Sequence, residues 1–165
     1  MLRRLTEYLD KHSVKYVVLT HSPAYTALEV AAISHVPGRE VAKTVMVNME
    51  GKMCMAVLPS SFMVDFDLLE KALHATAMEL AAENDFKELF PDCEIGAMPP
   101  FGNLFGMDVF VDRNLIGEHE IIFNAGNHRE LIRMDAADFE RLVQPKVLSF
   151  GVRRKWLEDE IEATP

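Results

Sequence analysis

The chain has 165 residues, enough for one domain with a substantial hydrophobic core and too few for two domains of ordinary size. About half of the residues are hydrophobic and a quarter are charged, as in most soluble globular proteins. The formal net charge of −9 excludes broad, non-specific binding to duplex DNA or RNA, which needs a basic face, but it leaves room for a local cation that holds a charged terminus.

No segment predicts a membrane protein or a secreted one. No apolar run approaches the roughly 20 residues that span a bilayer, and residues 1–5 lack the apolar core of a secretory signal. Cys54 and Cys93 show neither metal-ligand spacing nor a disulfide framework. We therefore expect a reducing, cytoplasmic environment.

Apolar spacing and capping residues predict a chain that mixes helices and strands. Helices are expected near residues 2–9, 26–37, 65–73, 85–91 and 135–145. Strands are expected at residues 15–21, 41–48, 52–58, 107–112, 120–124 and 129–134. The strands at 41–48 and 52–58 should pair as a hairpin, and the strand at 120–124 should lie centrally because it is apolar on both faces.

Two helix starts carry specific expectations. Asp65 should cap the helix at 65–73, with Leu68 and Leu69 facing inward, and Asp85 should begin the short helix that follows. The whole pattern predicts an α+β fold, a single domain at residues 1–152 with a mixed, largely antiparallel sheet flanked by helices. Residues 153–165 are expected to be a charged tail.

The most distinctive stretch is the loop at residues 94–106, which contains three glycines and the pair Pro99-Pro100. It is too rich in glycine and proline for a regular helix or a central strand. A stiff loop of this kind, anchored by the strand behind it, either leaves backbone N–H groups free to face a ligand or is only a tight structural connection.

Lys43 is the first candidate for a functional side chain. Strand alternation places it on the same face as Val41, Val45 and Val47. A lysine among valines either extends along the strand rim to reach water or points into a cleft, where its ammonium suits a phosphate or a developing oxyanion.

His21 and His128 each follow an expected strand, where functional loops concentrate, although a structural histidine is the commoner case. Glu118-His119-Glu120 has no second His or Cys at ligand spacing, which favours a solvated turn over a metal site. Nucleophile elbows, phosphate-binding loops and dinucleotide fingerprints are absent from the sequence. An enzyme built on this chain would position its substrate and water, with no covalent intermediate.

Three segments together give the chain a family resemblance. They are Val-Ala-Lys-Thr-Val at residues 41–45, Gly-x-x-x-Pro-Phe-Gly at residues 96–102 and Asn-Ala-Gly-Asn-His at residues 124–128. In this order and spacing they resemble the YbaK/prolyl-tRNA-synthetase-associated domain family, the free-standing relatives of the editing domain of bacterial prolyl-tRNA synthetases. The resemblance spans roughly residues 1–150.

The resemblance implies the fold of that family and hydrolysis of mischarged aminoacyl-tRNA, with tRNAPro carrying Ala, Ser, Thr or Cys as the first candidate. It implies catalytic roles for Lys43, Gly96 and His128, and a site next to the 3′ end of the tRNA. The residues expected to bind substrate around them are His21, Thr44, Pro100, Phe101, Gly102, Ala125 and Gly126. Neither a metal nor an organic cofactor is expected, and prolyl-tRNA synthetase is a candidate partner.

An aminoacyl ester is already activated, so positioning and oxyanion stabilisation suffice for its hydrolysis. The alternative is a non-catalytic module that binds tRNA acceptor ends, nucleotides or a synthetase, because the same lysine and glycine loop would serve both functions. The amino acid preferred by the site depends on pocket size, where one methylene changes binding by only about 1–3 kcal/mol.

Overall fold

The structure, a computed structural model, describes residues 1–24, 29–31 and 38–153. The named helices are α1 (Arg3–Lys11), α3 (Phe66–Leu73), α4 (Glu83–Phe86) and α5 (Ala136–Val143), and residues 29–31 are also helical. The strands are β1 (Tyr16–Thr20), β2 (Ala42–Met49), β3 (Lys52–Pro59), β4 (Phe62–Val64), β5 (Met78–Leu80), β6 (Val109–Asp112), β7 (Glu120–Asn124), β8 (Glu130–Asp135), β9 (Lys146–Leu148) and β10 (Gly151–Arg153). Within these residues, no helix combines the length and apolar composition of a membrane span.

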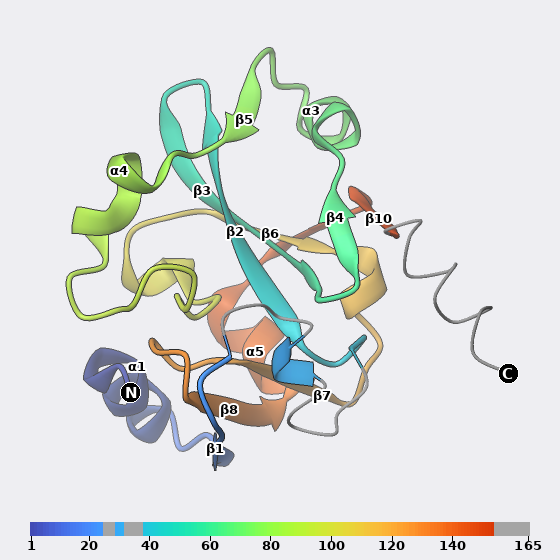
Figure 1. The fold of residues 1–165 in the computed structure, drawn as a ribbon. Helices are drawn as coiled ribbons and strands as arrows, with labels where there is room; N and C mark the ends of the chain where they lie inside the picture. The colour runs from blue at the N-terminus through green and yellow to red at the C-terminus, as the bar shows by residue number, and fades with distance from the viewer. Residues whose placement is uncertain (25–28, 32–37, 154–165) are drawn as a thin grey trace, which may run out of the picture.

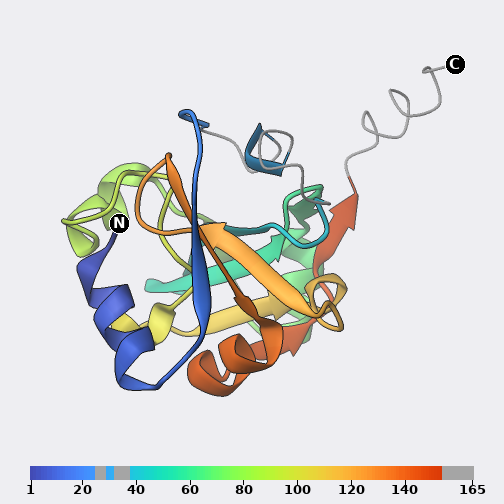
Figure 2. The ribbon, with the colours of Figure 1, turned by 90° about the horizontal axis from the view of Figure 1, so that it is seen from below.

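The strands form three sheets. The largest has the order β5-β2-β3-β6-β9, in which β2 pairs antiparallel with β3 and β5, whereas β6 runs parallel to β3 and β9. A second, antiparallel sheet has the order β1-β8-β7, and β4 pairs with β10 in the third. Figure 2 shows the strands of the second sheet crossing over those of the first. The expected mixed α+β domain is confirmed.

The main core lies between the two larger sheets and is closed by α1 and α5 (Figure 1). Inward residues of β2, β3 and β6 meet Ile121 and Phe123 of β7 and Ile132 of β8. Leu5 and Leu9 of α1 are fully buried there, as their helical spacing predicts. A smaller apolar cluster covers the other face of the large sheet under α3, and includes Leu69.

Several predicted elements appear where the sequence placed them. The hairpin of β2 and β3 forms around Glu50 and Gly51, and the side chain of Asp65 accepts a hydrogen bond from Leu68 N–H at 3.0 Å. The inward placement of Leu68 is wrong: the residue is 39% exposed, whereas Leu69 beside it is fully buried against the sheet. Most of the predicted 26–37 helix lies outside the described residues.

Two other predictions need correction. β7 is not central: it ends the second sheet, and a single parallel bridge between Val41 and Ile122 joins it to β2. It is apolar on both faces because it is packed between two apolar clusters, which burial alone explains. Asp85 does not begin its helix. α4 starts at Glu83, and the Asp85 carboxylate accepts from Ala82 N–H at 3.3 Å from the third helical position.

The short strands β4, β5, β9 and β10 were not predicted. A buried carboxylate holds the last of them in place: Asp112 accepts from the N–H groups of Phe150 and Gly151 at 3.0 and 2.6 Å. A Cβ at Gly151 would lie 2.9 Å from Cγ of Asp112, so glycine is needed for this close approach. Residues 154–165, the expected tail, lie outside the described residues.

Candidate functional site

A tight turn at residues 94–97 presents Gly96 at the surface. Ala97 N–H donates to the Glu94 carbonyl at 3.0 Å, which closes the turn. Gly96 occupies its third position with a φ of +84°, as a type II turn requires. A Cβ at this position would lie 3.5 Å from Cε1 of His128, an ordinary contact. Glycine is therefore needed here for its backbone conformation, and the space beside it is shared with His128.

The turn is fastened to the segment at residues 126–128. Glu94 N–H donates to the Gly126 carbonyl at 2.8 Å, and Gly126 N–H donates to the Ala97 carbonyl at 3.0 Å. The Glu94 carboxylate accepts from His128 N–H at 3.0 Å. Nε2 of His128 lies 2.8 Å from the Ile95 carbonyl, which can only accept, so Nε2 carries the proton in this arrangement. His128 thus holds the Gly96 turn in place.

Opposite the turn, β2 has an open edge. On the side away from β3, two backbone hydrogen bonds flank an unpaired stretch of this edge. Ile122 N–H donates to the Glu40 carbonyl at 3.0 Å before it, and Ala81 N–H donates to the Met46 carbonyl at 3.0 Å after it. Because backbone groups alternate along a strand, Thr44 directs its N–H and C=O to the same side as Glu40 and Met46. Among the described residues, no strand pairs with β2 there between the bridge at Val41 and the β5 pairing at Val47.

A cavity of about 260 Å³ occupies this gap. Its lining consists of Thr44, Val45, Met46, Leu80, Ala81, Glu83, Phe86, Ile95, Gly96 and Met98. The buried floor is apolar and formed by Met46, Phe86 and Met98. Leu80 and Ile95 are exposed at 64% and 42%, so the mouth is also largely apolar. The volume lies below the roughly 300–1,000 Å³ of drug-sized sites, which suits a small ligand group.

The structure brings Thr44 and Gly96 together at this gap, and His128 lies against Gly96 but is not among the described residues that line the cavity. Lys43 is half-buried on β2, but strand alternation directs its side chain to the opposite face from Thr44. His21 follows β1, next to the segment at residues 126–128. Its N–H donates to the Arg129 carbonyl at 2.9 Å, and its Nδ1 lies 2.5 Å from the Ser22 carbonyl. His21 does not line the cavity.

The second half of the glycine–proline loop forms framework. Phe101 is fully buried, with ring centroids 5.5 Å from Phe123 and 5.6 Å from Phe139. A Cβ at Gly102 would lie 2.6 Å from Cγ2 of Val109, which explains the glycine by close packing. Pro100 is also buried. These residues place the turn by anchoring its C-terminal side in the core.

Ala125 and Gly126 are framework residues too. The Ala125 carbonyl accepts from Leu2 N–H at 2.7 Å, which fixes the start of α1. A Cβ at Gly126 would lie 3.0 Å from Cβ of Leu2, and the φ of +101° also demands glycine. Because Gly126 N–H already donates to Ala97, it is not available as a donor for a ligand.

Sequence reasoning missed Glu94 and the apolar floor. Glu94 opens the glycine–proline loop, but its carboxylate accepts from His128 N–H, 34 residues further along the chain, so no local pattern predicts this contact. The floor residues Met46, Phe86 and Met98 come from separate segments with ordinary core patterns, so no sequence signal marks them.

Near the turn, burial and the charge of Asp92 raise the pKa of Cys93 to about 11, so this thiol is protonated at neutral pH.

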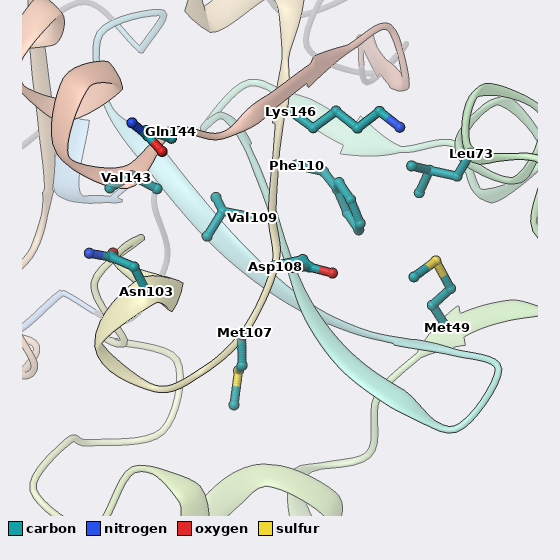
Figure 3. A pocket seen from close by; sticks show the side chains of 10 residues that line it. All are labelled: Met49, Leu73, Asn103, Met107, Asp108, Val109, Phe110, Val143, Gln144 and Lys146. Carbon is teal, nitrogen blue, oxygen red and sulfur yellow. The ribbon is translucent and has the colours of Figure 1, made fainter.

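A larger cavity, of about 570 Å³, lies between the start of β6, α3 and the end of α5 and contains none of the predicted residues (Figure 3). Leu73, Met49 and Phe110 gather on one side of it. Its carboxylate, Asp108, is paired with Lys52 at 2.8 Å. No convergent set of reactive groups lines this cavity, and the smaller gap beside Gly96 is the better candidate for a functional site.

Comparisons with known proteins identify the family of the chain. The chain is 26% identical over 153 residues to the multifunctional Ser/Thr-tRNA deacylase ProXp-y of Escherichia coli K12, covering 90% of this chain and 91% of the relative. Among solved structures, hypothetical protein APE2540 matches with a TM-score of 0.81 and 20% identity over 91% of this chain and 100% of that one.

A candidate trans-editing enzyme for prolyl tRNA synthetase matches with a TM-score of 0.76 and 21% identity, over 91% of this chain and 96% of that one. At these identities the two structures establish the shared fold. The sequence model of the aminoacyl-tRNA editing domain matches residues 21–142, which include β2, the Gly96 turn and His128. The chain belongs to the aminoacyl-tRNA editing domain family.

Proposed function

We propose that the protein is a trans-editing hydrolase that deacylates mischarged tRNA. The first candidate substrate is tRNAPro carrying Ala, Ser, Thr or Cys. The name of the E. coli relative, a Ser/Thr-tRNA deacylase, supports serine and threonine esters among these candidates. The observation that carries the proposal is the small cavity between the open edge of β2 and the Gly96 turn, in a chain of the editing-domain family.

The cavity fits the end of an aminoacyl-tRNA. Its apolar floor accommodates a small side chain, while Thr44 and Gly96 offer backbone groups to the ester. In the reaction a water oxygen adds to the ester carbonyl carbon, and the bond from that carbon to the ribose oxygen breaks. The ribose oxygen takes a proton, and the amino acid leaves with a free carboxylate. No protein nucleophile is required, because positioning and oxyanion stabilisation act on an already activated ester.

Lys43 and His128 take different roles in this proposal. His128 keeps the Gly96 turn in register through the Ile95 carbonyl, so it acts as a positioning residue. Lys43 lies on the other face of the open strand, where its ammonium would meet the ribose or the terminal phosphate of a tRNA end that wraps around the edge.

A deacylation assay tests the proposal. Ala-, Ser-, Thr- and Cys-charged tRNAPro are incubated with the protein, next to Pro-tRNAPro and to Ser- and Thr-charged tRNAs with other acceptors. We expect at least one small mischarged amino acid to be released well above its spontaneous rate, while Pro-tRNAPro stays intact. Protection of every ester would favour a non-catalytic module that binds acceptor ends, and no effect on any ester would overturn the proposal.

A further inference from the structure

The open edge of β2 offers one complete backbone pairing position, at Thr44. The turn at Glu50 and Gly51 is a two-residue hairpin loop, so its flanking pair and every second pair beyond it exchange hydrogen bonds between β2 and β3. Lys43 and Val45 belong to those pairs, and Thr44 does not. The same parity follows independently from Ser60 N–H, which donates to the Val41 carbonyl at 2.9 Å on the β3 side.

Thr44 therefore presents an N–H donor and a C=O acceptor side by side to the cavity. Among the described residues, no group accepts from this N–H or donates to this carbonyl. A half-buried peptide group of this kind is satisfied by water or by a ligand. The neighbouring positions on the same edge are partly used, by Ile122 through the Glu40 carbonyl and by Ala81 through the Met46 carbonyl.

An aminoacyl ester carries the complementary pair. Its α-ammonium is a donor, and its carbonyl oxygen is an acceptor that becomes more negative as water attacks. These two groups are separated by one α-carbon, as in a residue of a β-strand. Resting on the proposed function, we propose that the aminoacyl group adds to the edge of β2 as a one-residue strand: its α-ammonium donates to the Thr44 carbonyl, and Thr44 N–H donates to the ester carbonyl.

This arrangement fixes the configuration of the substrate. Directly opposed residues in an antiparallel pair place their side chains on the same face of the sheet. An L-amino acid paired with Thr44 would thus direct its side chain to the face of Thr44 and Met46, over the apolar floor. A D-amino acid in the same pairing would direct its side chain to the opposite face, away from the cavity.

Amide exchange and chemical shifts measured by NMR test the proposal without relying on turnover. In the free protein, Thr44 N–H should exchange with solvent much faster than the N–H groups of Lys43 and Val45. The probe is 3′-(L-alanylamino)-3′-deoxyadenosine, a stable amide analogue of the charged tRNA end. Its addition should slow exchange at Thr44 and shift the Thr44 amide resonance, and the analogue with a D-alanyl or a propionyl group should do so at least tenfold more weakly.

Replacing the peptide bond between Lys43 and Thr44 by an ester removes this N–H and leaves every side chain in place. We expect deacylation of the best substrate to fall roughly 10- to 100-fold in the folded variant. The matched control is the same replacement between Val17 and Val18. There the lost N–H also faces an open strand edge, since His21 N–H fixes the parity of β1, but it lies away from the cavity.

The outcomes separate the two proposals. A Thr44 N–H as protected as that of Val45, or equal responses to all three analogues, would overturn the one-residue strand, as would an ester variant with an undiminished rate. A wild-type protein that shows the Thr44 response but hydrolyses no aminoacyl-tRNA would support the pairing and contradict the proposed hydrolase. Hydrolysis of aminoacyl-tRNA without the Thr44 response would support the proposed hydrolase and contradict the pairing at Thr44.

Discussion

Lys43 illustrates how far strand alternation carries a prediction about one residue. Alternation places it with Val45 and Val47, which belong to the apolar cluster under α3, and the structure shows Lys43 half-buried. Thr44, for which the family resemblance implies only substrate binding, lines the cavity. A part in the reaction for Lys43 requires the tRNA end to pass around the edge of β2, so that ribose and phosphate lie on the lysine's side.

This geometry makes a prediction for two variants of Lys43. Lys43→Ala removes the ammonium, and Lys43→Arg replaces a compact cation by a planar fork that cannot occupy the same place. We expect both variants to melt near the wild-type temperature and to lose roughly a hundred- to thousandfold in deacylation rate, corresponding to about 2.7–4 kcal/mol of lost stabilisation.

Lys52→Ala is the matched control for Lys43. Lys52 lies on the neighbouring strand and forms an exposed ion pair with Asp108, which solvent screens. Its loss should leave deacylation unchanged. If Lys43→Ala hydrolysed its substrate as fast as the Lys52→Ala control, Lys43 would only extend along the strand to reach water.

At the scale of elements, the Gly96 turn and its fastening decide the shape of the site. Gly96 lines the cavity beside the open edge, and its turn is tied to the segment at residues 126–128 by backbone bonds and by His128. The sequence pointed to both segments through their glycines. It could not show that they are hydrogen-bonded to each other, since that contact spans residues far apart in the chain.

Gly96→Ala tests this element. A side chain at a φ of +84° strains the backbone by about 1–2 kcal/mol, and relief of the strain would move the turn away from β2. We expect a modest fall in melting temperature and a loss of deacylation larger than tenfold. Gly117→Ala is the control: its φ is +96°, and a Cβ there meets nothing within 4 Å.

The two glycine variants should therefore lose similar stability, while only Gly96→Ala loses activity. Equal activity in the two variants would show that the conformation of the Gly96 turn does not matter for the reaction. The comparison is meaningful because the same backbone cost is applied at two places, one beside the cavity and one remote from it.

Elements with their own local signals were predicted best. The hairpin of β2 and β3, the Asp65 cap and the buried face of α1 each depend on residues close in sequence. The short strands β5 and β9 have three residues each and exist because longer strands offer them an edge. The open edge at Thr44 is likewise defined by where β7 and β5 stop pairing, which no local pattern encodes.

At the scale of the whole molecule, the two crossed sheets and the net charge of −9 set the way a tRNA can approach. The division of the strands into separate sheets was not predicted, because periodicity gives the exposure of each strand and not its partner. The limit that the net charge places on tRNA binding does not depend on which strands pair. An acidic protein that acts on the end of a polyanion must engage few phosphates, and the apolar mouth formed by Leu80 and Ile95 is consistent with contact to the terminal nucleoside.

This limit on phosphate contacts predicts a shallow dependence of deacylation on salt. For single strands the logarithm of the binding constant falls with the logarithm of salt concentration with a slope of about −0.7 per phosphate contacted. With one or two contacts, kcat/KM should fall less than about tenfold between roughly 50 and 200 mM salt, whereas 6–10 contacts would lower it by about several hundredfold to ten-thousandfold. The measurement is kcat/KM across that range with subsaturating charged tRNA, corrected for spontaneous hydrolysis.

Lys43→Ala should reduce the slope by about 0.7 if the ammonium meets a phosphate, and leave it unchanged if it meets only the ribose. A steep slope in the wild-type protein would mean that the tRNA is held along an extended basic path, against the charge of the chain.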